Sequence, residues 1–169
     1  MKQKNNPMTI TSEVPEAGSA QAVSPRGRYF ANQTFHFETL RNAGYIVSNC
    51  ADLGEVLETV KVIAEGDVQS WYSAWVATAD RVLALAERTQ DLLSRGGAYM
   101  RASTYERMAE FLIPPDDPKR PESFEKTGSY FFKRLDTLGV RYERITVPYG
   151  AGNRGPCTTR DHKGLRLSH

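Results

Sequence analysis

Residues 67–112 have the sequence DVQSWYSAWVATADRVLALAERTQDLLSRGGAYMRASTYERMAEFL. In its first part, apolar and small residues recur at alternating spacings of four and three, which places them on one face of a helix. These residues are Trp71, Trp75, Thr78, Val82, Leu85, Thr89 and Leu92. The pattern predicts one long helix over residues 70–95.

Both ends of this helix carry capping signals. Asp67 or Ser70 can accept hydrogen bonds from the free backbone N–H groups of the first turn. Glycine favours the left-handed backbone that closes a helix, so Gly96 and Gly97 are expected to end it. The chain is then expected to turn back on itself.

A second helix is predicted over residues 98–112. Its inner face consists of Ala102, Tyr105, Ala109 and Leu112. Pro114 and Pro115 prevent the helix from continuing, because proline lacks a backbone N–H and disfavours a helical residue before it. The two segments together predict a core of helix packed against helix.

Two further helices are predicted at the flanks. Asp52, with Glu55 three positions later, forms an acidic capping box at the start of a helix over residues 52–65. After the proline-rich connector at residues 114–122, a helix over residues 123–138 begins with a serine cap. Its apolar face consists of Phe124, Phe131, Leu135 and Leu138.

The remaining segments complete the predicted fold. Residues 1–28 are polar and are expected to be disordered. An aromatic turn or short helix follows, with Phe35, Phe37, Leu40 and Tyr45. Alternating residues predict a strand at residues 140–150, with a bulge near Arg144. No segment of residues 151–169 is predicted to pair with this strand, and that tail is expected to be unstructured.

The predicted fold class is therefore mainly α. An antiparallel helical domain of the lid or cap type is expected at residues 29–139. One C-terminal β-strand follows it at residues 140–150, and unstructured segments lie at both ends of the chain.

The composition excludes several classes of function. The 169 residues carry 22 basic and 20 acidic side chains, a net charge of +2, which predicts no strong attraction to nucleic acid. No run of about 18 apolar residues suggests a membrane span. The start of the chain lacks the apolar core of an export signal, so a cytoplasmic protein is expected. Cys50 and Cys157 do not have the spacing of a metal site, and a disulfide between them is not expected.

Few residues suggest catalysis on their own. Ser103 and Ser129 have no histidine near them in the sequence, and His36 lies between two phenylalanines, where a structural role is favoured. The adjacent Asp116 and Asp117 lack the further oxygen ligands that a metal ion needs, so no metal site is predicted. The two tryptophans are assigned to the core.

Several motifs in a fixed order resemble a known family. They are FHFETLRNAGY, GDVQSWYSAW, AYMRASTYERMAEFL, DDPKRP and the strand end VPYG. Together they resemble the N-terminal helical domain of the α/β-hydrolases related to dihydroxypseudo-oxynicotine hydrolase and the FrsA-type esterases. The resemblance is greatest to the fungal hydrolases of yellowish-green conidial pigment, which shorten polyketides, and it covers residues 35–150.

The resemblance implies a chemistry. The strand at residues 140–150 would open an α/β-hydrolase sheet, and the helices would cover it and form part of the substrate pocket. The family's catalytic domain carries a serine, an aspartate and a histidine. It hydrolyses a carbon–carbon bond beside a carbonyl, or an ester, without a metal or organic cofactor. An acidic residue near the end of the second helix would face the pocket, which makes Glu110 a substrate-facing candidate. The residues alone favour a surface ion pair of Glu110 with Arg107.

The sequence departs from this family after Gly150. It contains no G-x-S-x-G motif, and only His162 and His169 follow the strand. We therefore expect a truncated form that lacks the Ser-Asp-His triad and is inactive alone, with residues 151–169 as an out-of-frame tail. The alternative is a stand-alone helical interaction module. Such a module would bind a full-length hydrolase, another partner or a second copy of itself through an exposed apolar face.

Overall fold

The computed structural model describes residues 29–149 and 153–160. In chain order, the elements are α1 Gln33–Gly44, the short 3-10 helix η1 Tyr45–Ser48, α2 Leu53–Val60, α3 Val68–Arg88, α4 Leu92–Glu110, α5 Lys119–Thr137, β1 Tyr142–Tyr149 and β2 Asn153–Arg160. The mainly helical fold predicted from the sequence is confirmed. The disorder predicted for residues 1–28, and the unstructured tail at residues 161–169, lie outside the described part of the chain.

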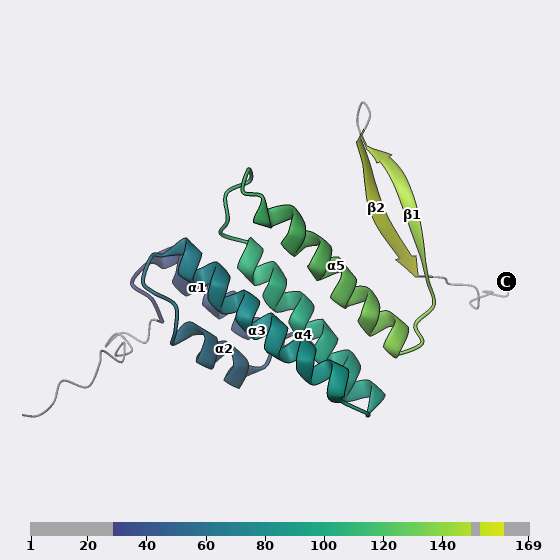
Figure 1. The fold of residues 1–169 in the computed structure, drawn as a ribbon, viewed down its shortest axis with the longest axis horizontal. Coiled ribbons are helices and arrows are strands. Elements are labelled where there is room, and N and C mark those ends of the chain that lie inside the picture. The colour runs from purple at the N-terminus through teal and green to yellow at the C-terminus, as the bar shows by residue number, and fades with distance from the viewer. Residues whose placement is uncertain (1–28, 150–152, 161–169) are drawn as a thin grey trace, which may run out of the picture.

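Three long helices form the centre of the fold. α3, α4 and α5 lie side by side, each antiparallel to the next (Figure 1). α1 and α2 lie on the α3 side of this row, and the β1–β2 hairpin lies beside α5. Among the described residues, no helix combines the length and the apolar character needed to cross a membrane.

The break between α3 and α4 lies earlier than predicted. α3 ends at Arg88 rather than at residue 95, and Thr89 adopts an extended backbone. Asp91 then accepts a hydrogen bond from Ser94 N at 2.7 Å and caps the new helix. A side-chain cap of this kind satisfies a free N–H group of the first turn, so it fixes where α4 begins.

The prediction that Gly96 and Gly97 end a helix is wrong, because both lie inside α4. A Cβ at Gly96 would lie only 3.0 Å from Cγ of Leu138, which follows α5. The glycine therefore lets Leu138 approach the α4 backbone closely, and this packing outweighs the poor helix propensity of glycine.

The core is aromatic. Trp71, Trp75 and Tyr105 are fully buried. The Phe35 and Trp71 rings lie 4.9 Å apart, and the Trp75 and Tyr105 rings stack at 5.6 Å, spacings that favour aromatic pairs. Trp71 Nε1 donates a hydrogen bond to the Met108 carbonyl at 2.8 Å. The assignment of both tryptophans to the core is confirmed.

The predicted apolar stripe on α3 is confirmed as far as Val82 and is wrong beyond it. Leu85 is 44% exposed and Leu92, now in α4, is 54% exposed, whereas Ala86 is fully buried. A helix has 3.6 residues per turn, so positions spaced alternately by four and three drift away from the buried face after a few turns.

The start of α2 is confirmed and its end is corrected. Asp52 Oδ1 accepts a hydrogen bond from Glu55 N at 3.0 Å, as the capping box predicts. The helix ends at Val60 rather than at residue 65. The Glu65 carboxylate instead accepts a hydrogen bond from Asn32 N at 2.7 Å, which ties the segment after α2 to the start of α1.

α5 begins at Lys119 rather than at Ser123, so the predicted serine cap is wrong. Ser123 lies inside the helix and is buried, as is Tyr130, while Phe124 on the predicted apolar face is 58% exposed. α5 therefore does not bury Phe124 against α4. Its end is confirmed, because Gly139 has a left-handed backbone with φ of 63°.

The expectation that β1 has no partner is wrong, since it pairs antiparallel with β2. The register runs residue for residue from Tyr142 opposite Arg160 to Tyr149 opposite Asn153, so the described ladder contains no bulge at Arg144. β2 lacks an alternating sequence, but a ladder joins backbone groups, which every non-proline residue carries.

Phe132 joins α5 to the hairpin. Its ring stacks on Tyr142 with centroids 5.3 Å apart, and the Arg144 guanidinium lies 4.3 Å from the ring centroid. Stacking and cation–π contacts of this kind each contribute about 0.5–1.5 kcal/mol at partly exposed sites. They are side-chain contacts that link the described hairpin to the helices.

Candidate functional site

Glu110 is the last residue of α4, and its partner is not the one expected. Its Oε1 lies 3.2 Å from Nε of Arg120 in α5, and its side chain is 15% exposed. Arg120 also donates through Nη1 to the Ile113 carbonyl at 2.9 Å. The pair with Arg107 is therefore wrong, and Arg120 joins α5 to the end of α4 instead. The role of Glu110 toward a substrate stays a prediction.

The serine and histidine side chains of the described residues do not form a catalytic pair. Nδ1 of His36 accepts a hydrogen bond from Tyr29 N at 3.2 Å. Ser103 donates to the Thr127 carbonyl at 2.8 Å, and Ser129 lines a hollow beside Phe132. A nucleophilic serine needs a base within hydrogen-bond reach, so this part of the chain offers no such arrangement. His162 and His169 lie outside it.

The adjacent aspartates, Asp116 and Asp117, lie just before α5. Asp117 Oδ1 accepts a hydrogen bond from Lys119 N at 2.9 Å, so this carboxylate satisfies a backbone N–H of the first turn. Over residues 29–149 and 153–160, no three acidic, histidine or cysteine side chains come together in a way that could hold a metal ion. The structure thus gives Asp117 a capping role.

Glu106 is a buried carboxyl that the sequence analysis missed. It lies in α4 and is fully buried, with one oxygen, Oε2, that has no hydrogen-bond partner. The other oxygen, Oε1, accepts a hydrogen bond from the Ser123 hydroxyl at 3.2 Å and lies 3.9 Å from Lys126 Nζ. The sequence could have predicted its burial, because Glu106 lies four residues after Ala102, which is on the predicted inner face of the helix.

Burial raises the pKa of the Glu106 carboxyl, and the positive charge of Lys126 opposes that rise. Asp80 on α3 and Glu122 on α5 add negative charge and raise the pKa further. Across the same interface, burial raises the pKa of the Tyr130 phenol. The packing of α5 on α4 therefore favours the protonated forms of the Glu106 carboxyl and the Tyr130 phenol.

A second missed cluster ties α2 to α4. Arg101 donates from Nε and Nη2 to the two oxygens of Glu55, at 2.9 and 3.1 Å. The Tyr105 hydroxyl donates to Glu55 Oε2 at 2.7 Å and accepts from Asp52 N at 2.8 Å. Burial raises the pKa of the Tyr105 phenol, so it stays protonated. No sequence signal joins residues this far apart in the chain.

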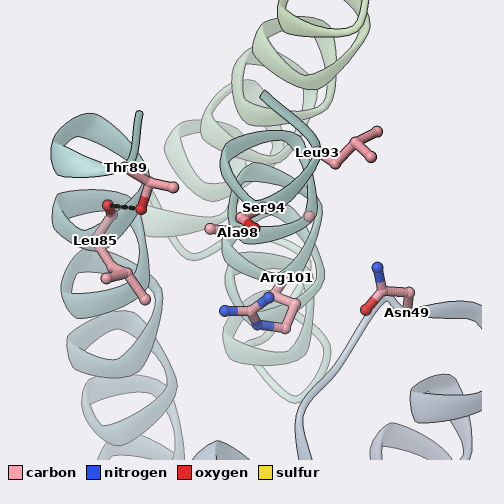
Figure 2. Close-up of a pocket in the computed structure, with 8 residues that line it drawn as sticks. Asn49, Leu85, Thr89, Leu93, Ser94, Ala98 and Arg101 are labelled. Atoms are coloured by element: carbon pink, nitrogen blue, oxygen red, sulfur yellow. Dashed lines mark hydrogen bonds between the residues drawn. The ribbon is translucent and has the colours of Figure 1, made fainter. Parts of the chain in front are cut away.

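Beside this cluster lies a groove of about 520 Å³. Ligand pockets are commonly roughly 300–1,000 Å³, so the groove has the size of a small-molecule site. Figure 2 shows where its lining comes from: Leu85 on α3, Thr89 directly after α3, Asn49 on the loop after η1, and Leu93, Ser94, Ala98 and Arg101 on α4. Gly97 completes the lining. The surface combines leucine side chains with the polar ends of an amide, two hydroxyls and a guanidinium.

Comparison with known proteins places this chain among hydrolases. It is 35% identical over 138 residues to Hydrolase ORFZ of Pyricularia oryzae, a match that covers 77% of this chain and 32% of that protein. It is also 35% identical over 127 residues to the 20-hydroxy-prefusarin hydrolase FUS2 of Gibberella moniliformis, covering 72% of this chain and 30% of FUS2. This chain belongs to a family of fungal hydrolases.

The fungal hydrolase family includes proteins named as α/β-hydrolases. One is psoB of Aspergillus fumigatus, which is 29% identical over 136 residues, covering 76% of this chain and 31% of psoB. No family model matches the chain. The chain spans about a third of the length of the curated fungal hydrolases that it matches. The resemblance stated from the sequence motifs is thereby confirmed.

Proposed function

We propose that this chain is the helical cap of a hydrolase of fungal secondary metabolism that acts on a polyketide or pigment precursor. The observation that carries the proposal is the pattern of the match. About three quarters of this chain, but only about 30% of each relative, is shared with proteins that are named hydrolases. One of these relatives is named for a single defined substrate, 20-hydroxy-prefusarin.

The proposed reaction is hydrolysis of an ester or of a carbon–carbon bond beside a carbonyl. Either reaction needs a nucleophile and a base that act as a unit, and loss of either member removes most of the rate. The described residues hold no serine beside a histidine. We therefore propose that the chemistry belongs to the remaining two thirds of a full-length family member, and that this chain alone does not turn over substrate.

Glu110 is proposed to act at the substrate, on the strength of its place at the end of α4 and its partial burial. A general acid or base contributes about 10²- to 10⁴-fold to a rate. In an active hybrid enzyme, Glu110→Gln should therefore lower kcat by about 10²-fold or more. Arg120→Gln is the matched control, because it breaks the same ion pair. Equal losses from the two variants would assign Glu110 a structural role only.

A hybrid tests the proposed function. Residues 29–139 of this chain would replace the matching segment of FUS2, and hydrolysis of 20-hydroxy-prefusarin would be followed by mass spectrometry. We expect activity in the hybrid and none in FUS2 from which the segment has been deleted. A deletion variant as active as intact FUS2 would contradict a cap that takes part in catalysis.

Other expectations stay predictions. The cytoplasmic location, the truncated state, the stand-alone interaction module and self-association have no observation among the described residues that favours them. Size-exclusion chromatography with light scattering of the purified chain would test self-association, since a strict monomer over a range of concentrations would contradict it.

A further inference from the structure

α5 does not bury its apolar residues against α4. The buried residues of this helix are Ser123 and Tyr130, and both carry a hydroxyl. Phe124 is 58% exposed, and Phe131 and Leu135 are half-buried. A helix on the surface of a globular protein normally turns its apolar face to the core. The outward apolar residues of α5 are therefore available for contacts other than those with α4.

A hollow of about 510 Å³ lies between the second half of α5 and the start of β1. Its apolar lining consists of Phe131, Leu135, Leu138, Val140 and Tyr142. Leu138 also lies close to the α4 backbone at Gly96, which ties the hollow to the helical core. Ligand pockets are commonly roughly 300–1,000 Å³ and mostly apolar, so this hollow has the size and the surface of a small-molecule site.

Two arginines, Arg134 and Arg141, complete the lining, and none of the described residues that line the hollow is acidic. Arg134 donates through Nη1 to the Gly96 carbonyl at 3.3 Å, which is a neutral acceptor, and Arg141 is exposed. Among the side chains of residues 29–144, no carboxylate forms an ion pair with either arginine. The hollow therefore combines an apolar surface with positive charge that these side chains do not match.

The neighbouring hollow along α5 and β1 has a different charge pattern. Its volume is about 480 Å³, and its two cations, Lys133 and Arg144, are accompanied by Glu125 and Asp136. Asp136 accepts a hydrogen bond from the Tyr142 hydroxyl at 3.0 Å. Charges of both signs are therefore present in the neighbouring hollow, and the excess of positive charge belongs to the hollow that Arg134 and Arg141 line.

We propose that the hollow between α5 and the start of β1 binds a small molecule that has an apolar body and one anionic group, such as a carboxylate. The body packs on Phe131 and Leu135, and the anionic group pairs with Arg134 and Arg141. A guanidinium has five N–H donors in one plane and binds carboxylates well. The hollow lies near the start of α4, at the opposite end from Glu110, and it does not depend on the proposed function. Its test therefore measures binding to the 169-residue chain rather than hydrolysis.

The probes are 2-naphthoate and 2-naphthamide, which share one shape and differ in charge. Isothermal titration calorimetry measures the affinity of each. We expect naphthoate to bind and naphthamide to bind about tenfold more weakly, because hydrogen bonds to a charged group are stronger. Added NaCl should weaken the binding of naphthoate alone, since salt screens charges. Equal affinities, or no binding of naphthoate, would overturn the proposal and leave the hollow as an apolar surface for contact with a protein.

Two variants place the binding in the hollow. Arg141→Gln should weaken naphthoate binding by about tenfold and leave naphthamide binding unchanged. Its Tm should stay the same, because Arg141 is exposed. Leu135→Ala should weaken the binding of both compounds by the same factor, about fivefold, because it removes apolar surface that both probes contact.

Arg81→Gln is the control, because it changes the net charge as Arg141→Gln does. Arg81 is exposed on α3, which α4 separates from α5 (Figure 1). Its replacement should leave naphthoate binding unchanged. Equal weakening by Arg81→Gln and Arg141→Gln would attribute the effect to net charge and would overturn the site. Unchanged naphthoate binding in Arg141→Gln would overturn it as well.

Discussion

Arg101 holds Glu55 through two parallel hydrogen bonds, Nε to Oε2 at 2.9 Å and Nη2 to Oε1 at 3.1 Å. The pair joins α4 to α2, and Tyr105 completes it by donating to Glu55 while it accepts from Asp52 N. Bidentate pairs of this kind are directional, so they fix the angle between two helices as well as their separation. α2 is short, and this cluster is one of the contacts that orient it, together with the hydrogen bond between Thr59 and Thr78.

Tyr105→Phe tests that cluster. The variant leaves Asp52 N–H without its partner and removes one donor from Glu55, so the free energy of unfolding should fall by about 1–3 kcal/mol. Urea denaturation measures the change. The control is Tyr72→Phe, at a half-buried tyrosine that packs under Lys119, which should change stability by less than about 0.5 kcal/mol. Similar losses in both variants would mean that the hydroxyl of Tyr105 does not stabilise the fold.

The glycine pair in α4 should respond unequally to alanine. Gly97→Ala should raise the free energy of unfolding by about 0.5–1 kcal/mol, because helix propensity improves and nothing is crowded. Gly96→Ala should gain less or lose, because its Cβ would crowd Leu138. In a double-mutant cycle, Leu138→Ala should restore the gain at Gly96. Additive effects of Gly96→Ala and Leu138→Ala would contradict the close packing described here.

Glu106 should make stability depend on pH. Its pKa is raised by burial in the folded chain, so the folded state holds the proton more tightly than the unfolded state. The stabilising contribution is complete below the unfolded pKa of about 4.3 and is lost as pH rises through the raised pKa. Glu106→Gln keeps the side chain neutral, so relative to wild type the variant should become more stable as pH rises from 4 toward neutral.

Glu122→Gln is the matched control for that titration. Glu122 is exposed, and the hydrogen bond from Lys126 lowers the pKa of its carboxyl. The stability that Glu122 contributes is therefore lost as the pH falls, whereas that of Glu106 is lost as the pH rises. Chemical denaturation at several pH values measures how the free energy of unfolding of the Glu106→Gln and Glu122→Gln variants changes with pH. A Glu106→Gln variant whose difference from wild type does not change with pH would show that the carboxyl titrates normally and is not held neutral by burial.

The hairpin should be held to the helices by Phe132. Phe132→Ala removes the single ring that both stacks on Tyr142 and lies under Arg144. Amide hydrogen exchange in β1 should then become faster, because the hairpin loses its aromatic contact with α5. Phe124→Ala, at a ring that is 58% exposed, should leave the exchange rates of β1 unchanged. Equal rates in wild type and Phe132→Ala would show that the hairpin is stable without α5.

Local signals predicted where α2 and α3 begin, but they failed at the starts of α4 and α5 and at the ends of α2 and α3. The carboxylates of Asp52 and Asp67 cap α2 and α3 as expected, since a cap depends on residues within one turn. The end of α3 could not be read in the same way. The glycine pair predicts a boundary at residues 96–97, whereas Asp91 caps α4, and the contact of Leu138 with α4 explains why Gly96 lies inside a helix.

Local spacing predicts some residues of the candidate site, whereas others depend on contacts between distant parts of the chain. The buried position of Glu106 follows from its spacing to Ala102 and could have been found. The pairing of Arg101 with Glu55 joins residues 46 positions apart and needs the packing of two helices, which no local pattern contains. The same holds for Glu110, whose partner Arg120 lies across a proline-rich connector. β2 was missed because it pairs through the backbone, which the sequence pattern does not record.

Labelling with a fluorophosphonate, which reacts with activated serines, would separate a cap from an enzyme. The reagent would be applied to the purified 169-residue chain and to the hybrid that carries residues 29–139 in FUS2, and labelled peptides would be identified by mass spectrometry. We predict an adduct on a serine from the FUS2 part of the hybrid and none on the chain alone. An adduct on a serine of this chain, such as Ser103 or Ser129, together with ester turnover, would contradict the proposal that its helices only cover the chemistry.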